Sequence, residues 1–444
     1  MVKSHTLHKL SGITAGVLLL LLSVSGFFLD HKGWSFLYTT TFKQVPSHTL
    51  QAEKRLLTSY YHDKEHPNHI ITGGYRGLFE SFDGGRSFSA VTALQILSMV
   101  PYRNQLYLAT SDGLYSYSNC QLHQLALSGK YLTALSVSNN TIVAVIEKRT
   151  LVVMERKNLK VLRQTQVKIP KVLLQEDITL SRFVRDLHYG RGLFEGDISL
   201  LINDYGALLL TYLALSGYLI WFLIRRKGYP KRVRKLIRTH ANAFAVAAVV
   251  PLLILAITGI FLDHASELSR FMKSVTIPHV TLPPVYSTLE NDIWSVDYNG
   301  KVYRIGNRYG VYKSDDLKKW SLESRGFAYK MIRRDGVLYI SGMGSPNRIL
   351  KEKNVTVLPK TPHMFRDVVW QDGNIRYFST AGQDLPVPRF DTITLYTLLL
   401  TIHDGSFFAP WWVWINDLGA LLLLLLMVTG IIRWRKRSAS IKGR

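Results

Sequence analysis

The chain has 444 residues, of which 47% are hydrophobic, a fraction too low for a protein that lies wholly in lipid. Its formal net charge of +24 is concentrated in short basic segments, which argues against a nucleic-acid-binding protein. Cys120 is the only cysteine and no Cys-x-x-Cys-His motif occurs, so internal disulfides, iron–sulfur clusters and covalently attached c-type haem are excluded.

Four apolar stretches are long enough to cross a hydrocarbon core, which needs about 20 residues. The first is predicted to be a retained span rather than a cleaved signal peptide, because it is long and an equivalent segment recurs in mid-chain. The four predicted spans cover residues 10–29, 200–224, 241–262 and 413–432.

Basic residues gather on one side of this four-span topology. Residues 225–240 contain eight Lys/Arg and residues 433–444 contain six, with no acid in either segment, and Lys3 and Lys9 add to the N-terminus. This is the positive-inside pattern, which places both termini and the central basic loop in the cytoplasm and the two long polar segments outside. Membrane lipid with anionic headgroups is the expected partner of this charge, and no nucleic acid is expected.

The membrane part of the sequence repeats. SGFFLDH at 25–31 matches TGIFLDH at 258–264, and NDYGALLL at 203–210 matches NDLGALLL at 416–423. Two copies of a two-helix unit in the same orientation are therefore predicted, related by an axis along the membrane normal. Each span also carries a Ser/Thr-Gly dipeptide, which is expected to let helices approach closely. The space that each glycine leaves beside the helix would also admit a flat macrocycle. The glycines are Gly26, Gly217, Gly259 and Gly430.

The two long segments between the spans are predicted to be β-rich. Short alternating strands such as QLYLATSDGLYSY at 105–117 are separated by Gly, Asp and Asn turns and recur about every 30 residues, as in propeller blades. Residues 81–88 resemble the Asp-box turn of sialidase-like propellers, and residues 314–320 resemble a shorter version. Such boxes are structural turns, and no arginine cluster suggests sialidase activity.

The expected fold is thus four transmembrane helices, formed by a duplicated two-helix unit, plus an external all-β, propeller-like domain built from two insertions. One propeller of six or seven blades is the first choice and two separate small β domains are the alternative; either would serve as a binding face or as a cap over the membrane site. The expected boundaries are 1–32, first transmembrane helix; 33–180, first β segment; 181–227, interfacial helix and second transmembrane helix; 228–240, basic cytoplasmic loop; 241–264, third transmembrane helix; 265–392, second β segment; 393–434, interfacial helix and fourth transmembrane helix; and 435–444, basic cytoplasmic tail.

Six of the 14 histidines fall into three matched pairs. Histidine is costly in lipid without a partner, so paired histidines near spans suggest a functional site, although any single one is more often an interfacial or capping residue. Two neutral imidazoles from opposing helices can complete six-coordinate haem iron. His8 and His240 open the first and third spans, His31 and His264 close them after an aspartate, and His188 and His403 precede the second and fourth spans.

These pairs predict two b-type haems, or three. At about 1.5 Å per residue, His8 and His31 lie roughly 34 Å apart and must serve opposite faces. The His240–His264 spacing is one residue longer, which a kink at Pro251 would absorb. The inner site would pair His8 with His240. The outer site could pair His188 with His403, or His31 with His264. A third arrangement has two outer haems, one between His31 and His188 and the other between His264 and His403.

Other polar residues of the spans have less specific predicted roles. Asp30 and Asp263 are expected to be polar helix ends, or to orient a neighbouring imidazole. A competing interpretation is a zinc or copper site formed by the four outer histidines. Four polar residues of the second and fourth spans are expected to bind haem propionates or histidines, or to join the helices. They are Asn203, Asp204, Asn416 and Asp417.

At these residues the sequence resembles the PepSY-associated transmembrane family. The shared pattern is a histidine that opens the first helix, a Ser/Thr-Gly followed by apolar residues and a terminal histidine, and a Leu/Ile-His-x-Gly motif at 187–190 and 402–405. The resemblance covers the spans and their flanks. The external part departs from it, because it looks like a propeller instead of PepSY modules.

The family includes ferrisiderophore reductases of the bacterial inner membrane. The resemblance therefore implies a haem-dependent ferric-chelate oxidoreductase that passes electrons to a periplasmic ferric chelate or protein acceptor. No Rossmann or flavin motif occurs, so the donor is expected to be quinol or a cytoplasmic reductase. The alternatives are a non-catalytic scaffold or sensor whose propeller binds a partner, and an accessory subunit of a metal transporter.

Overall fold

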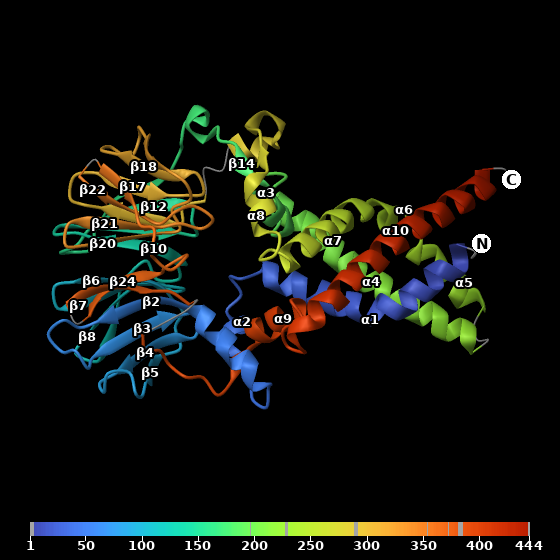
Figure 1. Cartoon of the computed structure of the whole chain (residues 1–444), viewed down its shortest axis with the longest axis horizontal. Helices are drawn as coiled ribbons and strands as arrows, with labels where there is room; N and C mark the ends of the chain where they lie inside the picture. The colour runs from blue at the N-terminus through green and yellow to red at the C-terminus, as the bar shows by residue number, and fades with distance from the viewer. Residues whose placement is uncertain are drawn as a thin grey trace. The chain divides into compact units, whose positions relative to one another are not determined.

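The computed structural model describes residues 4–195, 197–226, 230–287, 292–352, 354–371, 373–380 and 385–442. The chain divides into two compact units, each assembled from segments far apart in sequence (Figure 1). The helical unit comprises Met1–Thr40, Asp177–Tyr286 and Thr394–Arg444, and the β unit comprises Thr41–Glu176 and Ser287–Ile393.

Among its described residues, the helical unit contains three helices that are long and apolar enough to cross a membrane: α1, α4 and the segment Pro410–Lys436 around α10. In Figure 1 these helices run side by side, and α1 contacts both α4 and α10. The α-helices are α1 Ser4–Asp30, α2 Phe36–Thr39, α3 Leu180–His188, α4 Ile198–Arg225, α5 Pro230–His240, α6 Ala243–Ala247, α7 Val249–Asp263, α8 Ser269–Ser274, α9 Leu395–His403 and α10 Val413–Lys442; 3-10 helices cover Ser47–Leu56, Lys171–Leu174, His279–Thr281, Pro284–Ser287 and Pro410–Trp412.

The third predicted span is broken. Helices Pro230–Ala247 and Val249–Asp263 together pass the criteria for a membrane span, but they are bent by 70° at a break near Ala248. Pro251 explains the position of the break, because its ring displaces the carbonyl of residue 247 and it has no N–H to donate. Asn242 then caps α6 by accepting a hydrogen bond from the Ala245 N–H at 2.8 Å.

The basic segments at 228–240 and 435–444 were expected to be a cytoplasmic loop and a cytoplasmic tail, and where the structure describes them they are helical. Pro230–His240 forms α5, and α10 continues to Lys442. Lys and Arg are good helix formers, and Pro230 stands at the first helical position, where its missing N–H costs nothing. His240 consequently ends α5 instead of opening the third span.

The centre of the helical unit is an apolar core in which the two repeats interlock. Gly206 of α4 lies against Pro251 of α7, where an added Cβ would be 3.2 Å from the proline ring, and Gly419 of α10 lies similarly against Leu18 of α1 at 2.6 Å. Leu18 and Pro251 are separated by the repeat offset of 233, so the two contacts are equivalent. These two glycines make the close helix approach that was expected of the Ser/Thr-Gly dipeptides. The buried core residues are Ala15, Leu19, Leu210, Ala248, Leu252, Ala256, Leu423 and Met427.

The β unit consists of antiparallel sheets whose strands follow one another in chain order. Five sheets have four strands each, as expected for alternating segments closed by short Gly and Asn turns. They are β2 Leu57–His62, β3 Ile70–Gly74, β4 Gly77–Ser81, β5 Ser89–Thr92; β6 Ile96–Tyr102, β7 Gln105–Thr110, β8 Gly113–Ser118, β9 Gln121–Ala126; β10 Leu132–Val137, β11 Thr141–Ile146, β12 Thr150–Glu155, β13 Val161–Gln166; β16 Ser295–Tyr298, β17 Tyr303–Gly306, β18 Gly310–Ser314, β19 Ser321–Arg325; and β20 Lys330–Arg334, β21 Val337–Ser341, β22 Arg348–Lys351, β23 Asn354–Val357.

Smaller sheets complete the described strands. β24 Asp367–Gln371 pairs with β25 Asn374–Phe378 as a two-stranded sheet of the β unit. Contacts run from the first strand of each sheet to the first strand of the next, from β2 through β6, β10, β16, β20 and β24, and then back to β2. Two further pairs of two-residue strands are β1 Thr41–Phe42 with β26 Ile393–Thr394, and β14 Ile178–Thr179 with β15 Thr276–Ile277.

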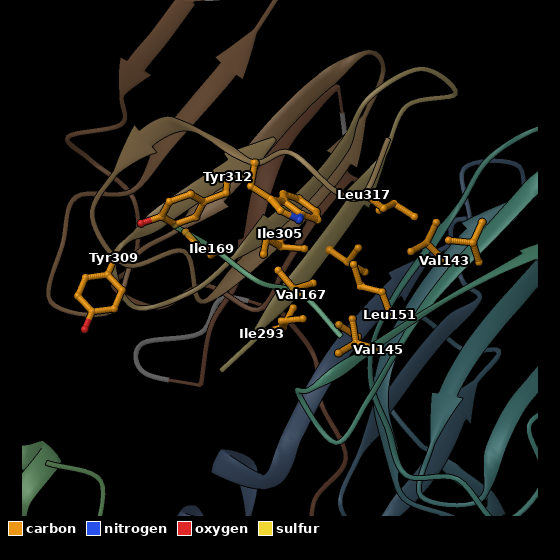
Figure 2. Packing of buried hydrophobic residues seen from close by; sticks show 14 of the residues in the cluster. Val143, Val145, Leu151, Val167, Ile169, Ile293, Ile305, Tyr309, Tyr312 and Leu317 are labelled. Atoms are coloured by element: carbon orange, nitrogen blue, oxygen red, sulfur yellow. The ribbon is translucent and has the colours of Figure 1, made fainter. Parts of the chain in front are cut away.

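The two β segments share one hydrophobic core. Figure 2 shows Val143, Val145 and Leu151 of the first segment in the same cluster as Ile293 and Ile305 of the second. All five side chains are buried. The two insertions therefore form one unit, as in the first of the two predicted arrangements, and not two separate small domains.

The two predicted Asp-box segments are hairpin turns in the β unit. Between β4 and β5 the Asp83 carboxylate accepts hydrogen bonds from the Ser81 and Ser87 hydroxyls at 2.8 and 2.6 Å. Between β18 and β19 the Asp316 carboxylate accepts from the backbone N–H groups of Lys318 and Lys319, and these bonds lower the pKa of Asp316 to about 2. Both segments thus have the structural role expected of them.

Candidate functional site

Four histidines bind the four Ser/Thr-Gly dipeptides of the membrane helices. In each case the Nδ1 atom of the imidazole lies within hydrogen-bond distance of the hydroxyl oxygen. The pairs are His8 with Thr429 at 2.8 Å, His240 with Ser216 at 2.7 Å, His188 with Thr258 at 3.0 Å and His403 with Ser25 at 2.9 Å.

The hydroxyl partners define which imidazole nitrogen carries the proton. A hydroxyl has one proton, and each of the four directs it to the backbone carbonyl four residues earlier in its own helix. The hydroxyl oxygen must therefore accept, and the imidazole Nδ1–H must donate, which leaves the lone pair on Nε2. The four intrahelical bonds are Ser25 to Leu21 at 2.6 Å, Ser216 to Tyr212 at 2.6 Å, Thr258 to Ile254 at 2.6 Å and Thr429 to Leu425 at 2.8 Å.

The glycine of each dipeptide makes room for the imidazole. An added Cβ at Gly26 would stand 3.2 Å from Cε1 of His403, and at Gly259 it would stand 3.7 Å from Cε1 of His188. Gly217 and Gly430 hold His240 and His8 in the same way, each at 3.6 Å. These glycines were expected to face another helix, and the structure places them against histidine rings instead.

Each histidine is held by the other repeat. His8 on α1 reaches the hydroxyl of α10, and His240 on α5 reaches that of α4. Among the outer histidines, His188 on α3 reaches α7, and His403 on α9 reaches α1. Each binding position is therefore composed of both repeats, as expected for two copies related by a pseudo-twofold axis.

The outer histidines, His188 and His403, lie next to each other. Their ring centroids are 6.3 Å apart with an angle of 58° between the planes. A metal–imidazole nitrogen bond is about 2 Å and a ring centre lies about 1 Å beyond its nitrogen, so two rings on one metal have centres about 6 Å apart. The observed separation fits one shared metal centre.

Matching local structure positions this outer pair. Helices α3 and α9 are nine residues long and each ends at its histidine. Thr179 and Thr394 cap their N-termini, accepting from the backbone N–H three residues later at 3.4 and 3.2 Å. Gly190 and Gly405, with φ of 62° and 80°, follow in the left-handed conformation that ends a helix and explain the His-x-Gly motif.

Two asparagines of the long helices hold the same pair from the other side. The Asn203 side-chain amide of α4 donates to the carbonyl of His188 at 2.9 Å, and that of Asn416 on α10 donates to the carbonyl of His403 at 3.1 Å. These two asparagines thus bind the histidines through the backbone carbonyl of each histidine and not through its ring. On α4 and α10, 13 residues separate these asparagines from the hydroxyls that hold the inner histidines, a rise of about 20 Å.

Of the two inner histidines, His240 lies within electrostatic range of His8. Arg433 of α10 lies within electrostatic range of both imidazoles. Among the described residues no hydrogen bond reaches Nε2 of His8, His240, His188 or His403, so each of these nitrogens is available to a ligand.

His31 and His264 have a different environment. Nε2 of His264 lies 2.7 Å from the Asp417 carboxylate, and Nε2 of His31 lies 3.6 Å from the Asp204 carboxylate while its Nδ1 donates to the Phe27 carbonyl at 2.8 Å. Their ring nitrogens are directed at protein oxygens of their own repeat. The orienting carboxylates are thus Asp204 and Asp417, and not the adjacent Asp30 and Asp263.

The residues that sequence reasoning missed are the hydroxyls of Ser25, Ser216, Thr258 and Thr429, which were noted only as companions of the glycines. A second missed signal is the repeated Ile-Thr-Leu at 178–180 and 393–395, which starts α3 and α9. The competing zinc or copper site lacks support, because in the described part of the chain no three His, Cys, Asp or Glu side chains converge.

Comparison with known proteins gives a family and a general likeness. A sequence profile of the PepSY-associated TM region matches residues 6–437. No functionally curated protein matches the chain.

Solved structures resemble it only distantly. The extracellular domain of a hybrid two-component system from B. thetaiotaomicron is 10% identical, with a TM-score of 0.36, over 76% of this chain and 32% of that one. PorZ, a surface component of the type-IX secretion system of Porphyromonas gingivalis, is 10% identical, with a TM-score of 0.35, over 70% of this chain and 28% of that one. The matched region thus spans about a third or less of these proteins' own length.

Proposed function

Because the chain belongs to the PepSY-associated transmembrane family, we propose that it is a membrane protein in which His8, His240, His188 and His403 bind two b-type haems and electrons pass between the two sites. The observation that carries this proposal is the hydrogen bond from each Nδ1–H to a Ser or Thr hydroxyl, which leaves four Nε2 lone pairs for iron. Haem held by two imidazoles supplies reversible one-electron chemistry.

The positions of four histidines support two sites at different depths. His188 and His403 form the outer site with the separation expected of two ligands on one iron, and His8 and His240 form the inner site about 20 Å away along α4 and α10. His31 and His264 lie outside the two proposed sites: Nε2 of His264 is 2.7 Å from the Asp417 carboxylate, within hydrogen-bond distance, and Nε2 of His31 is 3.6 Å from the Asp204 carboxylate, an electrostatic contact. Two sites at two depths make a path across the membrane.

The direction of electron flow depends on the orientation of the chain in the membrane, which we infer from the distribution of basic residues. The basic segments at the N-terminus, α5 and the end of α10 support a cytoplasmic position for these elements in a bacterial inner membrane, with the β unit in the periplasm. Electrons would then enter from quinol or a cytoplasmic reductase and leave to a periplasmic acceptor, with a ferric chelate as the candidate substrate.

The β unit is proposed to be a six-bladed propeller. Support comes from its five four-stranded sheets, its sixth, two-stranded sheet, and the ring of contacts that returns from β24 to β2. Propellers leave only short, protected sheet edges and commonly bind partners. The unit would therefore recognise the electron acceptor.

The test is a count of haem in purified full-length protein by the pyridine haemochrome method. We expect two haems b per chain. His188→Ala or His403→Ala should remove one low-spin signal and His8→Ala or His240→Ala the other, whereas His123→Ala, an exposed residue of β9, should keep both. A colourless wild-type protein, or four variants that all retain the wild-type spectrum, would refute the proposal and favour a scaffold or sensor.

A further inference from the structure

His264 and Asp417 form a histidine–carboxylate pair in the helical unit. Nε2 of His264 lies 2.7 Å from the Asp417 carboxylate, which accepts a hydrogen bond from it. A neutral imidazole that donates from Nε2 has its lone pair on Nδ1. The pair therefore has the arrangement of a general base, in which the carboxylate orients the ring and stabilises the imidazolium that forms when Nδ1 takes a proton.

The Nδ1 atom of His264 is available to a ligand. No described residue forms a hydrogen bond with it, yet it is not a buried atom, and the His264 side chain as a whole is 17% exposed. An acceptor that is accessible and unpaired can take a proton from a bound molecule without first losing a partner in the protein.

An exposed aromatic ring lies beside this imidazole. The ring centre of Trp414 is 4.9 Å from that of His264, with an angle of 50° between the planes. Trp414 is 65% exposed and begins an exposed apolar stripe of α10, which continues four and seven residues further on with Leu418 and Leu421. Because α10 is long and apolar enough to cross a membrane, this stripe gives a lipid-soluble aromatic molecule access to the imidazole and a ring on which to stack.

The first repeat does not offer the same arrangement. Nδ1 of His31 donates to the Phe27 carbonyl at 2.8 Å, and Nε2 of the same ring lies 3.6 Å from the Asp204 carboxylate, too far for a hydrogen bond. At the repeat offset of 213, Leu201 stands where the second repeat has Trp414. The accessible base and its aromatic neighbour thus belong to the second repeat alone.

The histidine–carboxylate pair lies close to the proposed outer site. Thr258, whose hydroxyl holds one outer histidine, is six residues before His264, a rise of about 9 Å along α7. Asn416, whose amide holds the other outer histidine, directly precedes Asp417. A molecule bound beside His264 therefore has short, separate routes for its electrons, towards the outer site, and for its protons, through Nδ1.

We propose that His264 is the proton acceptor for a membrane quinol that stacks on Trp414, an inference that rests on the proposed function. Oxidation of one quinol to quinone releases two electrons and two protons. The electrons go one at a time to ferric haem at the proposed outer site, which becomes ferrous. Each proton passes from a quinol hydroxyl to Nδ1 of His264, where Asp417 stabilises the imidazolium, and then to water.

The experiment uses full-length protein, an azido-ubiquinone and decylubiquinol. Binding is measured by photochemical crosslinking of the azido-ubiquinone, mapped by mass spectrometry with decylubiquinol as competitor, a readout that does not require haem. The rate of haem reduction by decylubiquinol is measured beside reduction by dithionite. The variants are His264→Gln, Asp417→Asn and Trp414→Ala, and their controls at the equivalent positions of the first repeat are His31→Gln, Asp204→Asn and Leu201→Ala.

Each variant has its own expected result. Trp414→Ala should lower the crosslink about tenfold, because the stacking surface is lost, and Leu201→Ala should not. His264→Gln should slow reduction by decylubiquinol at least 100-fold without changing haem content or reduction by dithionite, because the proton acceptor is removed. Asp417→Asn should lower the maximal rate but not the half-saturating decylubiquinol concentration, as expected for a residue that positions the base.

Equal rates with decylubiquinol in His264→Gln and His31→Gln, or a wild-type protein without a crosslink near Trp414, would overturn the proposal. A protein without haem would refute the proposed function and quinol oxidation with it, whereas a crosslink in that protein that is lost in Trp414→Ala would still support quinol binding. Should His264→Gln fail to fold, Trp414→Ala decides, because its ring is exposed and can be removed without opening the core.

Discussion

The hydroxyl of Ser25 shows how one small side chain can set the chemistry of another. It donates to the Leu21 carbonyl and accepts from His403, so it fixes both the orientation and the tautomer of the imidazole. Groups that hold the second nitrogen of a ligating histidine change metal affinity by roughly 10–100-fold when removed.

Under the proposed function, Ser25→Ala is therefore expected to weaken retention of the proposed outer haem by about 10–100-fold while leaving the proposed inner haem in place. Loss of haem to an excess of a competing haem-binding protein, followed by the Soret band, measures this. Ser23→Ala is the matched control, since its hydroxyl lies on the same helix but bonds to Thr211 and the Leu20 carbonyl. Equal retention in both variants would contradict the role assigned to Ser25.

At the scale of elements, the short helices α3 and α9 carry the outer histidines to their positions. Each begins at a capping threonine and ends at a histidine followed by a left-handed glycine. The glycine is required for two reasons at Gly405: its φ is 80°, and an added Cβ would stand 2.5 Å from the Trp412 ring.

Gly405→Ala is expected to disturb the end of α9 and so to perturb the outer haem spectrum selectively, with a backbone cost of about 1–2 kcal/mol. The low-spin signals of the two haems and the thermal unfolding temperature are the measurements. Gly336→Ala in the β20–β21 turn is the control, because it has a similar φ of 79° but no atom within 4 Å of the added Cβ. An unchanged outer signal in Gly405→Ala would show that the helix end does not position His403.

The sequence alone predicted the secondary-structure elements better than it predicted which of their residues contact one another. The repeat, the three histidine pairs and the family resemblance could all be read from matched motifs, and the family match over residues 6–437 confirms the last. Which hydroxyl holds which histidine could not be read, because the partners lie 24 to 421 residues apart and come from opposite repeats. The helix α5 was missed since a run of basic residues looks like a solvated loop, although Lys and Arg favour helix.

At the scale of the whole molecule, both units depend on segments from the two halves of the chain. The half 1–226 contains His8 and His188, and the half 230–444 contains His240 and His403, while each histidine is held by a hydroxyl of the other half. Neither half has a complete site.

We therefore expect residues 1–226 or 230–444 expressed alone to bind no six-coordinate haem, and the two halves expressed together to recover both haems. Copurification of the halves and their absorption spectrum measure this. The control is coexpression of 1–226 with a 230–444 half that carries His240→Ala and His403→Ala. A single half that shows a bis-imidazole spectrum would refute the shared sites.

The β unit makes a prediction about pH. Lys330 of β20 is partly buried and donates to the Leu97 carbonyl at 2.9 Å. Partial removal of its ammonium group from water lowers its pKa to about 8, an effect that nearby Asp367 opposes and Arg366 reinforces. The unfolded chain has the ordinary lysine pKa of 10.5 and so binds more protons between these values, which means that raising the pH favours the folded state.

The unfolding temperature of the β unit should accordingly rise as pH increases from about 8 towards 10, before unfolded tyrosines lose protons. Burial raises the pKa of Tyr60 well above its ordinary value, so this residue does not titrate in the folded unit in this range. Circular dichroism of the full-length protein at each pH is the measurement. Lys330→Met should remove most of this rise in unfolding temperature, whereas Lys319→Met, at an exposed position, should not change it. A rise that persists in Lys330→Met would mean that another group causes it.

The exchange of partners between the repeats also bears on how such a chain could arise. A single ancestral copy would carry one histidine for each site and a Ser/Thr-Gly dipeptide that holds the other copy's histidine. It could not bring these two groups together within one chain. Before the copies were joined, two identical chains would have had to associate to close either centre. Fusion would have made that association permanent and freed the copies to diverge wherever symmetry was no longer needed.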